Sequence, residues 1–161
     1  MYILLIVYFL LFIFLSSKNL KYGIYWIIFT LPAYLIRFDF FNLPTTLLEG
    51  GILILFLIWL IKNFKKLRIN KGFLIPISLF LLSATVSVFV SPDFYSALGV
   101  WKAYFIEPIL FLIVFVSTLK KEDLKGLFMV FGIQVVILSL FAIYQKFTGV
   151  LISNPFWADE A

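Results

Sequence analysis

The sequence predicts an all-α protein, a polytopic bundle of about five or six transmembrane helices. Of its 161 residues, 64% are hydrophobic, 20% are aromatic and only 13% are charged. An average soluble domain is about half apolar and about a quarter charged. The charged residues also fall in short clusters between long apolar runs. This spacing is typical of a helical membrane protein rather than of a soluble core.

Six apolar runs give the expected spans, and together they form one transmembrane domain. The first run is short, because about 20 residues are needed to cross a bilayer. No basic region precedes it and no small-residue cleavage motif follows it, so we interpret it as a helix rather than a signal peptide. The expected spans lie near residues 2–17, 22–36, 47–61, 73–90, 104–119 and 127–145.

Proline, threonine and glycine residues predict local features of the second and third runs. Pro32 has no N–H to offer the carbonyl of Ile28, so we expect the second helix to bend there. Residues 40–46 are rich in turn-forming types, and a threonine cap precedes the third apolar run. Gly50 and Gly51, near the start of that run, would allow another helix to approach closely.

The fourth run carries small residues at helical spacing. Ser83, Ala84 and Ser87 lie three and four positions apart. Residues at this spacing share one face of a helix, and small side chains there usually indicate tight helix packing. We therefore expect this face to contact a neighbouring helix.

The stretch 91–112 is the most informative part of the chain. It begins with a short polar loop and enters an apolar run that carries Lys102, Tyr104 and Glu107, followed at once by Pro108. Because proline cannot donate to the carbonyl of Tyr104, the helix should kink or start anew there. A lysine and a carboxylate would then lie together at the edge of a bilayer, where polar groups are costly and often functional.

The distribution of basic residues predicts the orientation. One set of loops holds ten of the thirteen lysines and arginines, and such loops face the cytoplasm. These loops are 18–21, 62–71 and 120–125. Loops 37–46 and 91–102, the C-terminal tail and Met1 then face outside.

Several function classes are excluded by composition. The chain has no cysteine and no histidine, which removes disulfides, thiolate metal sites and the usual general base. It has no glycine-rich phosphate loop and no nucleophile elbow. The net charge of +5 is explained by the loops beside the spans, so we expect membrane lipids rather than nucleic acid as partners. We expect no metal and no cofactor.

The candidate substrate-binding residues are Arg37, Lys102, Tyr104 and Glu107, and the pattern assigns no catalytic residue. In the predicted orientation they gather near the outer face with Glu49. There a cation could bind a phosphate, and a carboxylate could accept a proton from an attacking hydroxyl. The alternative is structural: Arg37 and Lys102 would reach to the interface, and Glu49 would stabilise a helix start.

Four segments carry a resemblance to a known family. They are LPAYLIR at 31–37, LPTTLLE at 43–49, SPDFYSALG at 91–99 and WKAYFIEP at 101–108, with similar tail segments at 144–149 and 154–157. They resemble the N-terminal half of bacterial O-antigen ligase and O-antigen polymerase membrane proteins.

The resemblance implies a multi-pass protein of the bacterial inner membrane with the fold of C-type glycosyltransferases. It also implies transfer of a glycan from an undecaprenyl-pyrophosphate carrier to an acceptor hydroxyl on the outer side. Family members have about twice as many spans, and their key residues lie in the second half. We therefore expect this chain to be a fragment that is inactive alone. The alternative is a non-enzymatic small membrane protein, namely a scaffold, channel or transporter subunit.

Overall fold

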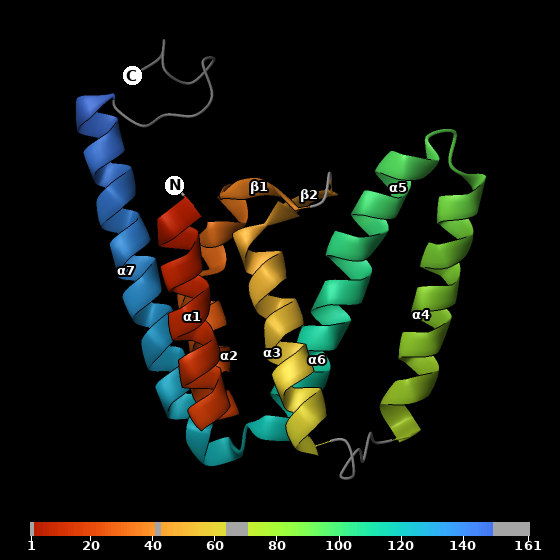
Figure 1. The fold of residues 1–161 in the computed structure, drawn as a ribbon, viewed down its shortest axis with the longest axis horizontal. Helices are drawn as coiled ribbons and strands as arrows, with labels where there is room; N and C mark the ends of the chain where they lie inside the picture. Colours follow the sequence, from red (N-terminus) through yellow and green to blue (C-terminus); the bar gives the residue numbers. More distant parts are fainter. Residues whose placement is uncertain (1, 41–42, 64–70, 150–161) are drawn as a thin grey trace.

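The structure is a computed structural model that describes residues 2–40, 43–63 and 71–149. The predictions for the tail segment 154–157 and for most of the basic loop 62–71 lie outside these residues. The described part is almost entirely helical, which confirms the all-α class (Figure 1). Its main helices are α1 (Tyr2–Lys18), α2 (Leu20–Phe29), α3 (Leu47–Asn63), α4 (Lys71–Val90), α5 (Phe94–Trp101), α6 (Glu107–Thr118) and α7 (Leu124–Thr148).

Short segments complete or join these helices. The 3-10 turn η1 (Leu31–Leu35) follows α2, the π-helical turn η3 (Lys102–Ile106) joins α5 to α6, and the 3-10 turn η4 (Lys121–Asp123) precedes α7. Figure 1 shows that α1, α2, α3 and α4 run in alternating directions, that α5 and α6 form one continuous rod, and that α7 runs back beside α2.

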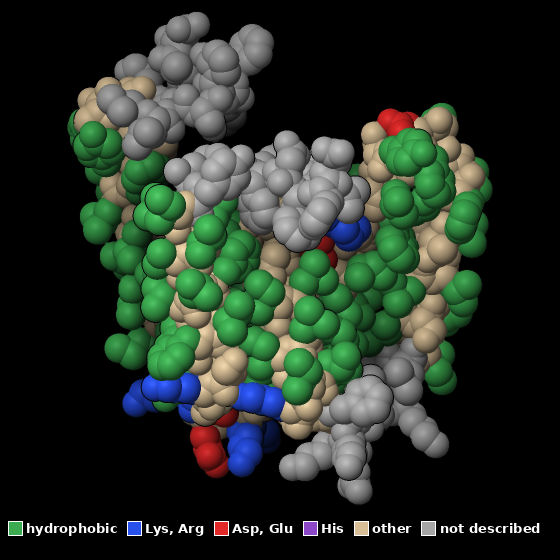
Figure 2. All heavy atoms as spheres, viewed as in Figure 1, with side chains coloured by type: hydrophobic (Ala, Val, Ile, Leu, Met, Phe, Trp, Pro, Cys, Tyr) green, Lys and Arg blue, Asp and Glu red, His purple; other side chains and the backbone are tan. Residues whose placement is uncertain are grey.

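Within the described residues, two helices are long and apolar enough to cross a membrane. They are the continuous helix Phe94–Thr118 and the helix Lys121–Thr148. Large hydrophobic side chains such as Leu4, Phe89 and Phe147 are mostly exposed. Figure 2 shows hydrophobic side chains covering the middle of the visible face, with charged side chains towards its two ends. This distribution indicates membrane association, while a total of five or six crossings stays a prediction.

The region after α2 differs from the sequence prediction. We expected one helical run over 22–36 and then a turn-rich loop. Instead α2 ends at Phe29, and η1 carries the chain past Pro32, which has no N–H for a further α-helical bond. The loop is a hairpin in which β1 (Arg37–Phe40) pairs antiparallel with β2 (Leu43–Thr46).

The core lies where α1, α2, α3 and α6 meet. Its fully buried side chains include Phe12, Ile24, Leu55 and Val114, one from each of these helices. Gly51 confirms the predicted close approach, because a Cβ atom there would lie 2.7 Å from Cδ1 of Ile27. The core therefore fixes the first turns of α3 against the rest of the bundle.

Helix α4 packs only against the α5–η3 rod among its principal contacts. The predicted packing face is wrong in part: Ala84 is buried, but Ser83 and Ser87 are exposed and donate to carbonyls one turn earlier in α4. The contact instead includes a hydrogen bond from Nε1 of Trp101 to Oγ1 of Thr85, at 3.1 Å. The hydroxyl of a serine can donate to a carbonyl of its own helix, so a serine can lie on the exposed face. Small side chains therefore did not identify the buried face of α4.

Candidate functional site

The site is built around the widened helical turn at residues 102–106. The N–H of Glu107 donates to the carbonyl of Lys102, five residues earlier, as in a π-helix. Pro108 explains this geometry, because it cannot donate to the carbonyl of Tyr104 and the donors shift by one position. The expected new helix start is thus a wider turn, and the helix continues as α6. This turn places residues 102 and 107 on one side of the helix.

Lys102 forms an ion pair with Glu49 of α3. Its Nζ lies 2.8 Å from Oε2 of Glu49, and the two side chains are 39% and 12% exposed. Lys102 and Glu107 lie near each other as predicted, but the direct ion pair of Lys102 is with Glu49. The packing of α3 against α6 brings a carboxylate across from the turn, and the spacing of residues along one helix does not reveal such a neighbour.

Glu49 is itself held at the start of α3. The N–H of Glu49 donates to Oγ1 of Thr46 at 3.2 Å, which confirms the predicted threonine cap. A carboxylate in the first turn also interacts favourably with the helix dipole. The cap and the dipole together fix the acid that Lys102 contacts.

Glu107 is the third member of the cluster. It is only 4% exposed, and its Oε1 has no hydrogen-bond partner within the described chain. It lies close enough to Glu49 and Lys102 to interact electrostatically with both. A buried carboxyl group without a partner costs free energy, so its position here points to a ligand or a proton.

Of the other two predicted residues, only Tyr104 has a described side chain. Tyr104 is 73% exposed and contributes no contact to the ion pair. The backbone of Arg37 lies opposite Thr46 in the hairpin, at the same end of the bundle, but its side chain is outside the described residues. The structure therefore brings together Glu49, Lys102 and Glu107.

A capped loop precedes the site at the same end. Asp93 caps α5 by accepting from the N–H of Ser96 at 3.1 Å, and the hydroxyl of Ser96 donates to the same carboxylate. The Ser96 hydroxyl, followed by its N–H, holds the pKa of Asp93 below its usual value. This cap fixes where the α5–η3 rod begins.

A second polar cluster lies at the opposite end, and the sequence did not indicate it. Nζ of Lys21 lies 2.8 Å from Oδ1 of Asp123, and the hydroxyl of Tyr25 donates to the Asp123 carbonyl at 2.8 Å. These contacts join α2 to η4, about a hundred residues later. Only the charged character of the loop was visible in the sequence.

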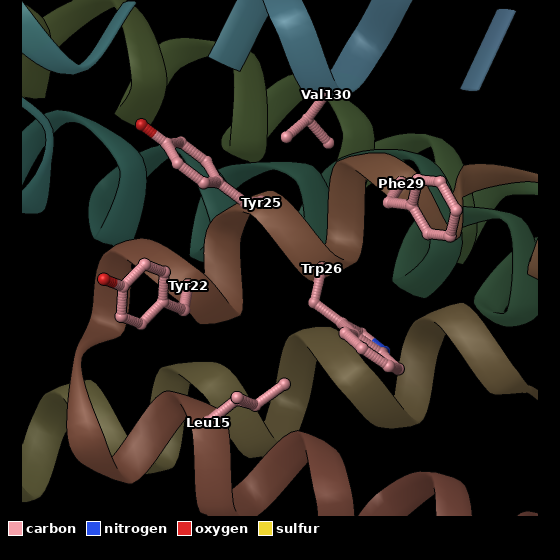
Figure 3. Close-up of a pocket in the computed structure, with 6 residues that line it drawn as sticks. All are labelled: Leu15, Tyr22, Tyr25, Trp26, Phe29 and Val130. Carbon is pink, nitrogen blue, oxygen red and sulfur yellow. The ribbon is translucent and has the colours of Figure 1, made fainter. Parts of the chain in front are cut away.

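No group of three or more His, Cys, Asp or Glu side chains that could hold a metal occurs within the described ranges. The hollows among the described residues include the following two. One, of about 330 Å³, lies between η1 and α7 and includes the buried amide of Gln134. The other, of about 260 Å³, lies along α2 and is shown in Figure 3.

Comparisons with known proteins identify no relative of this chain. No family model, no curated protein and no solved structure matches the chain. The structure itself shows a helical protein with two helices that could span a membrane among the described residues. It also shows a partly buried Glu49–Lys102–Glu107 cluster at one end.

Proposed function

We propose that this chain is part of a membrane glycan ligase or polymerase of the bacterial inner membrane. Such an enzyme transfers an oligosaccharide from undecaprenyl pyrophosphate to an acceptor hydroxyl at the outer face. The proposal combines the resemblance of the four sequence segments with one structural observation. That observation is the buried, unpartnered Glu107 beside a Lys102–Glu49 ion pair, at the end opposite the lysine-rich turn.

The chemistry of transfer fits these side chains. The acceptor hydroxyl forms a bond to the anomeric carbon of the glycan, and the bond from that carbon to the pyrophosphate oxygen breaks. The electron pair leaves with the pyrophosphate, and the hydroxyl proton passes to a base. Lys102 would exchange Glu49 for the pyrophosphate, and an ionised Glu107 could accept the proton. The bond-making machinery beyond these groups belongs to the rest of the enzyme.

Carrier binding tests this role in the chain as it stands. The purified chain in lipid nanodiscs should bind undecaprenyl pyrophosphate more tightly than undecaprenol, because only the former offers a pyrophosphate to Lys102. Lys102→Ala should weaken binding of the pyrophosphate form by about tenfold, the value of one charge-assisted hydrogen bond.

Lys121→Ala is the matched control, since this lysine is exposed and lies in the turn at the opposite end. Binding of the two carriers with equal affinity by the wild-type chain would refute the role of the cluster. So would equal losses in Lys102→Ala and Lys121→Ala.

The same Glu107 also supports a second candidate, a proton-coupled transporter or channel subunit. A carboxyl group buried within a membrane helix is typical of proton pathways. In that case Glu107→Gln would abolish proton flux in proteoliposomes, and the carrier would not bind.

A further inference from the structure

A groove runs along α2, between α1 on one side and α7 on the other (Figure 3). Its volume is about 260 Å³, and every side chain that lines it is aliphatic or aromatic. Four aromatic residues of α2 form its floor. The lining residues are Tyr22, Tyr25, Trp26 and Phe29 of α2, Leu15 of α1 and Val130 of α7.

The groove is preformed and open to its surroundings. Tyr22 is 50% exposed and Phe29 is 40% exposed, so the floor is accessible from outside the bundle. Tyr25 is fixed by its hydrogen bond to the Asp123 carbonyl. Gly126 of α7 makes room for this ring, because a Cβ atom there would lie 2.7 Å from the Tyr25 hydroxyl oxygen. An apolar chain would therefore enter a groove whose shape is already set.

Each helix that forms the groove carries a lysine near the same end of the bundle. Lys18 ends α1, Lys21 is the second residue of α2, and Lys125 is the second residue of α7. Lys21 is paired with Asp123, whereas Lys125 is exposed and Lys18 lies over the ring of Phe14 at 4.3 Å. Figure 2 shows Lys and Arg side chains gathered at this end. The mouth of the groove is therefore positively charged.

We propose that this groove binds an acyl chain of an anionic phospholipid, whose phosphate is held by Lys18 and Lys125. The lining is made of aliphatic and aromatic side chains, and the position of the groove on an apolar surface makes lipid the neighbouring molecule. The lysines at its mouth select a negatively charged headgroup. This site is separate from the Glu49–Lys102–Glu107 cluster and does not depend on the function proposed there.

Lipid binding to the purified chain in detergent tests the proposal by native mass spectrometry. Phosphatidylglycerol and phosphatidylcholine with identical acyl chains are the two probes. The wild-type chain should retain phosphatidylglycerol preferentially. Lys18→Gln combined with Lys125→Gln should lower this preference about fivefold or more, since each lysine near an anionic headgroup contributes. Lys146→Gln, an exposed lysine near the far end of α7, is the charge control.

The groove itself is tested by filling it. Val130→Trp should reduce retention of both lipids, whereas Val136→Trp, at a position that is 57% exposed on the same helix, should not. Equal retention of the two lipids by the wild type, or equal behaviour of the two tryptophan variants, would overturn the proposal.

A second measurement uses Trp26, which lines the groove, as a fluorescent reporter. Phosphatidylglycerol with brominated acyl chains should quench the fluorescence of Trp26 more than brominated phosphatidylcholine does at the same mole fraction. The Trp26→Phe variant supplies the background from the other tryptophans. Equal quenching of Trp26 by both lipids would also refute the site.

Discussion

Lys102 lies between two carboxyl groups and pairs with only one of them. Glu49 receives the direct contact, and the buried Glu107 does not. If both acids are ionised, the cluster carries one more negative than positive charge. The positive charge of Lys102 therefore reduces the repulsion between two carboxylates in a small, partly buried volume.

This arrangement predicts measurable coupling between Lys102 and Glu49. In a double-mutant cycle with Lys102→Met and Glu49→Gln, the coupling in the free energy of unfolding should be about 1–3 kcal/mol, because the contact is partly buried. Chemical unfolding in detergent micelles provides the measurement. Lys121→Met with Glu122→Gln, on the exposed turn η4, should show almost no coupling. Equal coupling in both cycles would contradict the prediction.

The sequence predicted where the polar cluster lies better than it predicted its contacts. Charges inside apolar runs are rare, so Lys102 and Glu107 stood out as candidates. The partner of Lys102 comes from another helix, and no periodicity along the chain gives the rotation of one helix against another. The same limit explains why Tyr104, two residues after Lys102, is exposed instead.

Helices α1 and α2 are in close contact at Gly23. A Cβ atom there would lie 2.4 Å from Oγ of Ser16 and 2.6 Å from Cδ1 of Leu55. Neither neighbour is at the surface, since Ser16 and Leu55 are both fully buried. Three helices thus meet at one glycine, and this contact sets their spacing.

Gly23→Ala should destabilise the protein by about 1–3 kcal/mol, since the added methyl group overfills a closed site. Gly132→Ala is the matched control in α7, because no atom lies within 4 Å of a Cβ there. That variant should be neutral or stabilising by up to about 1 kcal/mol, the gain in helix propensity. Unfolding of both variants in the same micelles gives the comparison, and equal stability of the two would show that α1 and α2 are not in close contact.

The helices were predictable because long apolar runs leave few alternatives. Apolar periodicity does not show how a chain leaves a helix, so the hairpin of β1 and β2 was missed. The sequence predicted that the helices would be disturbed at Pro32 and Pro108, but not which structure would form there. The structure has the 3-10 turn η1 at Pro32 and a π-helical turn before Pro108. In each case the lost N–H was visible in the sequence, while the compensating hydrogen bonds depend on tertiary packing.

The bundle has two chemically different ends. Lysines gather at the end that contains η4. The hairpin, the start of α3 with Glu49 and the start of α5 with its Asp93 cap lie at the other end (Figures 1 and 2). By the positive-inside rule, the lysine-rich end is the one predicted to face the cytoplasm. The loops grouped by counting basic residues therefore lie together in space where they are described.

Cysteine labelling tests this orientation directly, because the chain has no cysteine of its own. In intact spheroplasts, a membrane-impermeant maleimide should label Pro92→Cys, which lies in the exposed loop before α5. It should label Glu122→Cys, in the exposed turn η4, only after the membrane is disrupted. Labelling of both variants in disrupted membranes is the control, and the reverse pattern in intact spheroplasts would contradict the predicted topology.

The contact between Lys21 and Asp123 joins positions 102 residues apart, and that separation has a consequence for biosynthesis. At ribosomal speeds, roughly 5 to 20 s pass between synthesis of the two residues. During this interval α1 and α2 are complete, while Lys21 and the Tyr25 hydroxyl still lack the partner that η4 will supply. Helices α1 and α2 can pack against each other and against α3 before then, but the polar contacts that tie α2 to η4 form only after Asp123 has been made.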